Sequence, residues 1–277
     1  MRNKNKNSSA NDNLNNINNT DNSNALKNEG DINKTTIAVE PSKPLGIGTK
    51  DSDSSTESEK IFTFTFYKVD PKWRWLNEMG KDEASREFNE LLQAAGKRMK
   101  IETYSTLGLR HESEFMIWTI SSSLENIQVL SSKIYTTILG KYIEPVSTFL
   151  SLTRRSIYSN QVKRGFETDK EPLQYVIVYP FIKSREWYLM PFEKRKEMME
   201  EHIKVGRKYP DILLNTTYSF GIDDQDFMLA FETNSLSRFQ DLIIELRETQ
   251  VSRYIIKDTP MIPCVRKDMA DIIKSLG

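Results

Sequence analysis

The chain is poor in the residues that most often bind metals or form cross-links. Its 277 residues include one cysteine, Cys264, and two histidines, His111 and His202. A single cysteine cannot form a disulfide within the chain, and it excludes an iron–sulfur cluster or cysteine-ligated zinc built by one chain. We therefore expect a reducing compartment and a cytoplasmic protein.

Net charge and long apolar runs are also missing. Lysine plus arginine number 39 and aspartate plus glutamate number 39, so the formal net charge is zero. Without a basic excess, neither a nucleic acid nor an anionic membrane surface is expected as a partner. No apolar run approaches the roughly eighteen residues of a membrane-spanning helix, so we expect no membrane span.

The N-terminal segment, residues 1–59, lacks aromatic residues, and 13 asparagines fall within residues 1–33. Residues 50–60 are charged and rich in serine. Such a composition buries too little apolar area to offset chain entropy, and it lacks the apolar core of a signal peptide. We predict a disordered Asn/Ser-rich tail over 1–59 and a folded domain over 60–277.

The folded part contains an internal repeat. At a spacing of 112 residues, Tyr67 aligns with Tyr179 and Trp75 aligns with Trp187. A long-period self-match of this kind indicates two copies of one supersecondary unit. The second copy carries His202 where the first has no histidine. Because the copies share a scaffold, this difference points toward function.

Each copy is read as strand, helix, strand and helix. The first is predicted to contain a strand at Phe62–Val69, a helix at Glu83–Met99, a hairpin at Gly108, a strand at Glu114–Ile120 and a helix at Leu124–Leu139. The second is predicted to contain a strand at Tyr175–Tyr179 ended by Pro180, a helix from Pro191 to Tyr209, strands at 213–220 and 226–232, and a helix at Leu236–Arg247 capped by Ser235. This division gives repeat one at 60–139, a connector at 140–174 with a strand-like stretch at Ser147–Leu152, repeat two at 175–258 and a C-terminal extension at 259–277. Two such α+β units would place their sheets edge to edge with the helices outside.

An ordered set of motifs in the second copy resembles a known signature. Its members are Tyr179-Pro180, Lys183, Glu186-Trp187-Tyr188-Leu189-Met190-Pro191, Glu201-His202, Gly206-Arg207, Tyr209, Asn215-Thr216, Phe220, Asp224, Phe227, Arg247 and Ser252. Over about residues 60–258 the chain resembles the chlorite dismutase family, which includes the coproheme decarboxylases of haem biosynthesis. The resemblance implies two fused ferredoxin-like repeats forming a dimeric α+β barrel, haem iron in repeat two, and usually a homopentamer.

His202 is the candidate iron ligand. It shares one predicted helix face with Met198, Val205 and Gly206, and a neutral imidazole on an apolar face can ligate haem iron. Gly206 would let a flat macrocycle approach the helix. A packed core histidine, or one exposed beside Glu201, explains the same pattern. The family resemblance favours the iron ligand.

Two further candidates lie on the strand before this helix. A phenol at Tyr179 could donate a hydrogen bond or hold a radical during oxidation by hydrogen peroxide, and the family's decarboxylases have their reactive tyrosine at this position. The alternative is an ordinary strand aromatic. Lys183 could pair with a porphyrin propionate, or it could be a solvated turn residue.

Three more residues follow from the resemblance. Trp187 would wall the haem, although its match with Trp75 makes core packing an equal alternative. Arg247 and Ser252 match family contacts to propionates, and each could instead have a helix C-terminal or surface role. A basic pair, Lys163-Arg164, lies near a segment that some decarboxylases use similarly.

The distal side departs from the family pattern. Leu214 stands where chlorite-degrading members carry an arginine, and an apolar side chain cannot stabilise the reactive oxyanion, so chlorite chemistry is not expected. Val162, beside Gln161, stands where some decarboxylases have a distal histidine. His111 belongs to the first repeat. The usual base that activates peroxide is therefore missing.

Three functions remain open from the sequence. The first is a coproheme decarboxylase that uses hydrogen peroxide to remove CO2 from two propionates. The second is a protein that binds haem b and has weak peroxidase activity or a sensor or carrier role. The third is a family scaffold that has lost haem and serves as an oligomeric interaction module. Tyr179, Lys183 and His202 together favour the first two.

Overall fold

The computed structural model describes residues 59–158, 166 and 171–277. Two sets of sequence predictions therefore lie outside the described residues. They are the tail, apart from residue 59, and the segment that holds Gln161, Val162, Lys163 and Arg164.

The first half of the described chain follows the predicted order of elements. It contains β1 (Ile61–Val69), a 3₁₀ helix η1 (Pro71–Trp75), α1 (Glu78–Gly96), β2 (Lys100–Ser105), β3 (Phe115–Ser121), α2 (Leu124–Thr136), a second 3₁₀ helix η2 (Leu139–Lys141) and β4 (Ile143–Leu152). Each main helix begins at a side chain that accepts a backbone N–H, Asn77 for α1 and Ser123 for α2.

The second half repeats that order and then adds to it. It contains β5 (Tyr175–Lys183), α3 (Arg185–Leu189), α4 (Phe192–Gly206), β6 (Leu213–Tyr218), β7 (Phe227–Thr233), α5 (Leu236–Arg247), a 3₁₀ helix η4 (Gln250–Tyr254), β8 (Ile255–Lys257), β9 (Ile262–Arg266) and α6 (Met269–Ser275). Ser235 caps α5 as predicted. Gly108 and Gly221 have φ of 75° and 74° in the β2–β3 and β6–β7 connections, a conformation that favours glycine.

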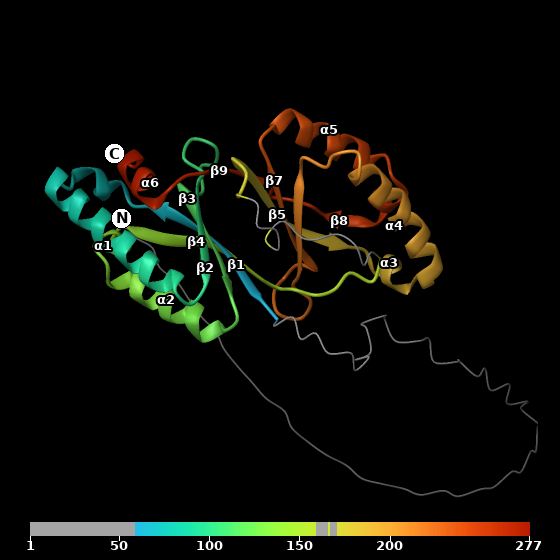
Figure 1. The fold of residues 1–277 in the computed structure, drawn as a ribbon, viewed down its shortest axis with the longest axis horizontal. Helices are drawn as coiled ribbons and strands as arrows, with labels where there is room; N and C mark the ends of the chain where they lie inside the picture. Colours follow the sequence, from blue (N-terminus) through green and yellow to red (C-terminus); the bar gives the residue numbers. More distant parts are fainter. Residues whose placement is uncertain (1–58, 159–165, 167–170) are drawn as a thin grey trace, which may run out of the picture. The chain divides into compact units, whose positions relative to one another are not determined.

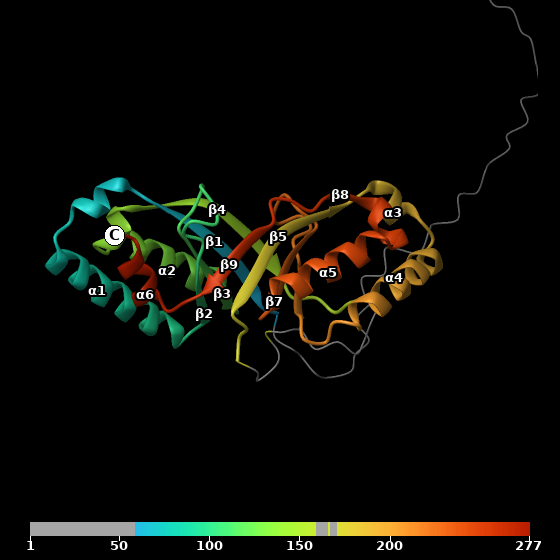
Figure 2. The same cartoon turned by 90° about the horizontal axis from the view of Figure 1, so that it is seen from above.

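The strands form one sheet that closes on itself. Their order is β7-β6-β4-β1-β3-β2-β9-β5-β8, and β7 also pairs with β5. The β5–β7 pairing completes a ring, and β8 lies outside it beside β5. This arrangement confirms the predicted fold class, two α+β repeats joined in a barrel, and Figures 1 and 2 show how the strands of the two halves face each other.

Three apolar clusters hold the fold together. Inside the ring, Phe62, Phe64 and Trp118 of the first half pack with Val176 and Met228 of the second. Outside it, one cluster joins the first-half strands to α1, α2 and α6, and another joins the second-half strands to α4 and α5. Figures 1 and 2 show these helices on the outer side of the strands. The second outer cluster contains Tyr179.

Pro180 does not end its strand, contrary to the sequence prediction. β5 continues through it to Lys183, and Pro180 lies opposite Met228 of β7. On its other side, β5 pairs with β9 up to Val178 and with β8 from Ile182 onward. Pro180 therefore falls in the gap between two short partner strands, where a missing backbone donor is tolerated.

Other boundaries differ from the sequence predictions by up to five residues, the largest shift being at α1, which begins at Glu78 rather than at Glu83. The helix predicted from Pro191 to Tyr209 is α4, which has Pro191 as its N-cap and ends at Gly206. α2 ends at Thr136 rather than at residue 139. The short helix α3 and the C-terminal elements β8, β9 and α6 were not predicted.

The repeat match between Trp75 and Trp187 does not extend to their packing. Trp187 is 1% exposed, whereas Trp75 is 89% exposed. The buried tryptophan of the first half is Trp73, two residues earlier in the same 3₁₀ helix. A 3₁₀ helix turns every three residues, so positions two apart cannot share a face, and only Trp73 reaches the core.

In the described part of the chain, no helix has both the length and the apolar character that crossing a membrane requires.

Candidate functional site

The candidate site lies between the second-half strands and α4. Strand alternation turns Ile177 and Tyr179 of β5 toward the helices, where they pack with Phe231 and with Phe239 of α5. Leu214 of β6 lies opposite Phe231, which itself lies opposite Ile177, so all of these side chains share one face. The face is largely apolar and aromatic.

His202 stands on α4, the helix predicted for it, and is half-buried. Its Nδ1 is buried and has no hydrogen-bond partner in the described part of the chain. Burial and the nearby charge of Lys183 lower the pKa of His202 to about 4. The imidazole is therefore neutral at physiological pH, the form that can donate a lone pair to a metal.

Lys183 ends β5 and is only 8% exposed. Its Nζ lies 3.8 Å from the Trp187 ring centroid and 3.7 Å from Met199 Sδ on α4. Burial and the positive charge of Arg195 lower its pKa to about 7, and the carboxylate of Asp226 partly opposes this shift. Lys183 is therefore not the solvated turn residue of the alternative interpretation.

Trp187 is held in place by local structure. It belongs to α3, whose N-cap Ser184 accepts a hydrogen bond from the Trp187 backbone N–H at 3.3 Å. Its ring packs against Tyr254, at a centroid distance of 5.6 Å, and against Tyr158, at 6.4 Å. The indole thus forms a fixed wall beneath the Lys183 ammonium.

Tyr179 is 3% exposed and stacks on Phe231, with ring centroids 6.0 Å apart and planes 8° apart. Burial and the nearby carboxylate of Asp258 raise its pKa, while Arg247 opposes the shift. The phenol therefore stays protonated across the physiological range. Its position inside β5 keeps the ring rigid.

Arg247 and Ser252 are satisfied by local partners. Arg247 ends α5 and forms an exposed ion pair with Asp258, at 3.3 Å. Ser252 lies in η4, and its Oγ donates to the Thr249 carbonyl at 2.7 Å. Exposed pairs of this kind contribute little to stability, so Arg247 can exchange its partner at small cost.

The structure thus divides the predicted residues into groups. Lys183, Trp187 and His202 lie together beside α4, and Tyr179 lies near Arg247. A hydrogen bond of 3.0 Å from the Gln250 backbone N–H to Glu201 Oε2 ties α4 to η4, which carries Ser252.

The structure places Leu214 and His111 in different halves of the chain. Leu214 is 36% exposed on the same face as Tyr179, and it provides no charge there. His111 is exposed beside Glu112 between β2 and β3, in the first half and apart from the candidate site.

Sequence reasoning missed two residues at this site. Arg195 on α4 is 6% exposed, and its Nε has no hydrogen-bond partner in the described region. Tyr158, which follows β4, stacks on Phe192 with centroids 5.9 Å apart and lies beside Arg195. The signal for Arg195 was its spacing, seven residues before His202, which puts both on one helix face.

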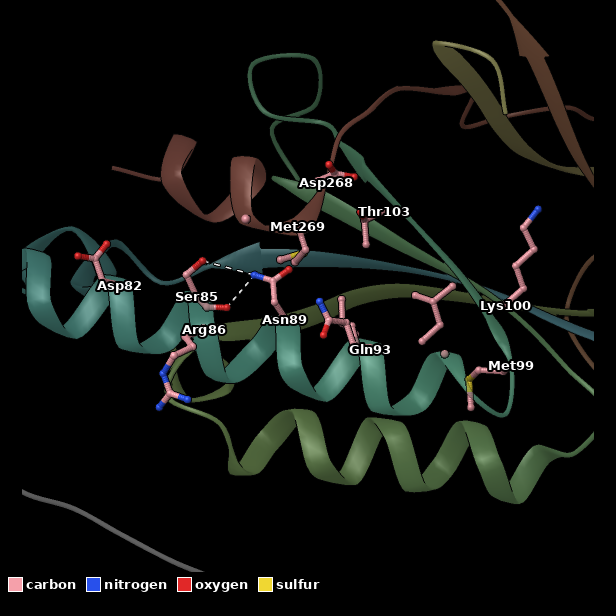
Figure 3. Close-up of a pocket in the computed structure, with 14 residues that line it drawn as sticks. Asp82, Ser85, Arg86, Asn89, Gln93, Met99, Lys100, Thr103, Asp268 and Met269 are labelled. Carbon is pink, nitrogen blue, oxygen red and sulfur yellow. Dashed lines mark hydrogen bonds between the residues drawn. The ribbon is translucent and has the colours of Figure 1, made fainter. Parts of the chain in front are cut away.

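A separate groove of about 880 Å³ lies in the first half, between α1, the strand β2 and the start of α6. Figure 3 shows its polar lining, including Arg86, Asn89 and Asp268, with Asn89 bonded to Ser85 of its own helix. None of the predicted site residues lines it. Among the described residues, no group of three or more His, Cys, Asp or Glu side chains could hold a metal ion.

Comparison with known proteins identifies the family. The model of the chlorite dismutase family matches residues 81–267. A coproheme decarboxylase of Mycolicibacterium smegmatis is 32% identical over 231 residues, covering 82% of this chain and 98% of the relative. The chain therefore belongs to the chlorite dismutase family.

Solved structures support the fold. Chlorite dismutase of Candidatus Nitrospira defluvii, solved in complex with imidazole, superposes with a TM-score of 0.73 at 23% identity. The match covers 79% of this chain and 96% of that chain. At this identity the likeness establishes the architecture.

Proposed function

We propose that this protein is a haem-binding enzyme that uses hydrogen peroxide to decarboxylate the propionates of iron-coproporphyrin (coproheme). The observation that carries the proposal is His202, a neutral imidazole with an unpaired buried Nδ1, next to the buried ammonium of Lys183. An iron ligand and a carboxylate-binding cation side by side suit a porphyrin that bears propionates. The 32% identity with a coproheme decarboxylase supports the same substrate.

Each candidate residue has a role in this proposal. His202 ligates the iron, and its orphaned Nδ1 fits a site that still needs a partner. Lys183 and Arg247 bind propionates as cations, and Ser252 adds a hydroxyl donor. Trp187 walls the pocket. The bound iron supplies the oxidising chemistry once peroxide is present, and the protein residues fix the substrate around it.

The chemistry requires an oxidant and a hydrogen donor. Each propionate and one H2O2, with one proton, give a vinyl group, CO2 and two waters, so the propionate loses two electrons to the peroxide. Tyr179 is buried and held protonated, so its hydroxyl is available as a hydrogen-atom relay between substrate and oxidant. The stacking on Phe231 fixes where that hydroxyl lies.

One observation favours a second function. Leu214 gives the distal side no charged or acid–base group on β6 to activate peroxide. A protein that binds haem b and has weak peroxidase activity, or a sensor or carrier role, is therefore the alternative. Oxygen release from chlorite is disfavoured by the same residue, because no cation stands where the oxyanion would need one.

We further propose a homo-oligomer of five subunits in the cytoplasm. Large apolar side chains are exposed on the single subunit, with Trp75 at 89%, Met79 at 82% and Leu189 at 84%. Such side chains are commonly covered by subunit contacts.

The test is the variant Tyr179→Phe, titrated with coproheme and then treated with peroxide, with products read by mass. Affinity should stay near normal, because the ring and the propionate contacts remain, and vinyl products should disappear. Tyr67→Phe is the matched control, since Tyr67 holds the equivalent strand position and stacks on Phe115 at 5.0 Å in the first half. Vinyl products from Tyr179→Phe would refute the role of Tyr179. If the unmodified protein binds coproheme and forms no vinyl products, the haem b-binding alternative replaces the enzyme.

A further inference from the structure

Two buried cations, Lys183 and Arg195, lie near each other at the α4 side of the site, and neither forms a salt bridge within the described part of the chain. Lys183 is 8% exposed and Arg195 is 6% exposed. The Lys183 ammonium has the Trp187 ring and the Met199 sulfur as neighbours. The Arg195 guanidinium lies 5.8 Å from the Phe192 ring centroid and beside the Tyr158 hydroxyl, and its Nε is unpaired.

Two buried cations placed in this way lower the stability of the folded protein when no ligand is bound. A guanidinium carries five donors and cannot lose its proton at physiological pH, so burial leaves both charge and donors to be satisfied. Two like charges near each other add repulsion, which is one cause of the lowered pKa of Lys183. An anionic ligand that enters between them would remove both penalties.

The position of Arg195 on α4 indicates where such a ligand would bind. Arg195, Met199 and His202 are spaced by four and three residues on α4, so they share one face. Seven residues correspond to about 10 Å along a helix axis. The guanidinium therefore faces the same space as the candidate iron ligand, at a distance from it that suits the rim of a porphyrin rather than its centre.

We propose that Arg195 is a further carboxylate-binding residue of this site, which takes a porphyrin propionate together with Lys183 and is positioned by Tyr158. The inference rests on the proposed function and deepens it. A guanidinium binds a carboxylate through two parallel N–H···O bonds, a geometry that an ammonium cannot offer. With Arg195, the site has three cations, the other two being Lys183 and Arg247. This number favours coproheme over haem b, which has fewer carboxylates.

The experiment compares Arg195→Gln with Lys196→Gln, an exposed position on the same helix. Each purified protein is titrated with iron-coproporphyrin and with iron octaethylporphyrin, which has no carboxylates. Loss of a charged hydrogen-bond partner should weaken coproheme binding by about tenfold or more and leave octaethylporphyrin binding unchanged. Arg195→Lys should restore part of the affinity, and Tyr158→Phe should give a smaller loss that also depends on the carboxylates.

A second measurement needs no porphyrin. In the ligand-free protein, Arg195→Met should raise the midpoint of thermal unfolding, because it removes an unpaired buried charge. A lowered midpoint, together with equal loss of affinity for both porphyrins, would mean that Arg195 is structural and would overturn the inference. An unchanged coproheme affinity in Arg195→Gln would overturn it as well. If the unmodified protein binds neither porphyrin, the proposed function itself fails.

Discussion

Replacing Lys183 by methionine should stabilise the ligand-free protein at neutral pH. The ammonium is 8% exposed, and its pKa falls from 10.5 to about 7 on folding. A base whose pKa is lower in the folded state destabilises that state wherever the unfolded chain keeps the proton. Methionine fills a similar volume without charge, so the cost disappears with the ammonium.

The size of the effect follows from the shift. Each pKa unit is worth about 1.4 kcal/mol, so the full penalty is roughly 5 kcal/mol at most below pH 7. Above pH 7 the folded protein loses the proton while the unfolded chain keeps it, and stability should rise by up to about 1.4 kcal/mol per pH unit until about pH 10.5. The charged groups facing Lys183 are Arg195 and Asp226, and the nearby His202 has a pKa of about 4, so its imidazole is neutral throughout this range.

Urea unfolding at several pH values between 7 and 10 measures both quantities. Lys183→Met should be more stable than the unmodified protein at pH 7 by roughly 2 kcal/mol or more, and the difference should shrink as the pH rises. Lys204→Met on the exposed side of α4 is the control and should show neither effect. Equal pH slopes in Lys183→Met and the unmodified protein would refute the reasoning.

The remaining predictions concern the ligand, the distal side and the assembly. His202→Ala should lose the histidine-ligated Soret band on haem titration, and an unchanged band would exclude His202 as the ligand. The unmodified protein should release negligible oxygen from chlorite, and Leu214→Arg should raise that release by supplying a cation on the Tyr179 face; rapid release before substitution would contradict our interpretation of the distal side. Light scattering after gel filtration should give the mass of five subunits. A monomer at micromolar concentration would contradict the proposed assembly.

Local chemistry explains why much of the fold could be predicted. The apolar residues of strands β3 and β7, the caps Ser123 and Ser235 and the turn glycine Gly108 each act within a few residues, so the sequence alone signals them. The end of β5 could not be predicted in this way. Whether Pro180 ends the strand depends on which strands lie beside it, and those come from residues 255–266.

The candidate site shows the same limit. The resemblance to the family signature pointed to Lys183 and His202, but Arg195 looked like any basic residue in a run of charged positions. Its neighbour Tyr158 lies far away in sequence and comes beside it only after folding. The exposure of Trp75 could not be predicted for a similar reason, because only the packing of η1 decides which of two nearby tryptophans enters the core.

The placement of β9 has a consequence for the order in which the molecule assembles. β9 bonds to β2 and to β5, and the hydrogen bond from Thr103 to Lys267 spans 164 residues. β9 follows both repeats in the chain, so both repeats are synthesised before the strand that joins them. The ring therefore closes only after β9 has been synthesised, and nascent chains expose unpaired edges on β2 and β5 until then. A chain truncated before Ile262 should keep those edges open and aggregate.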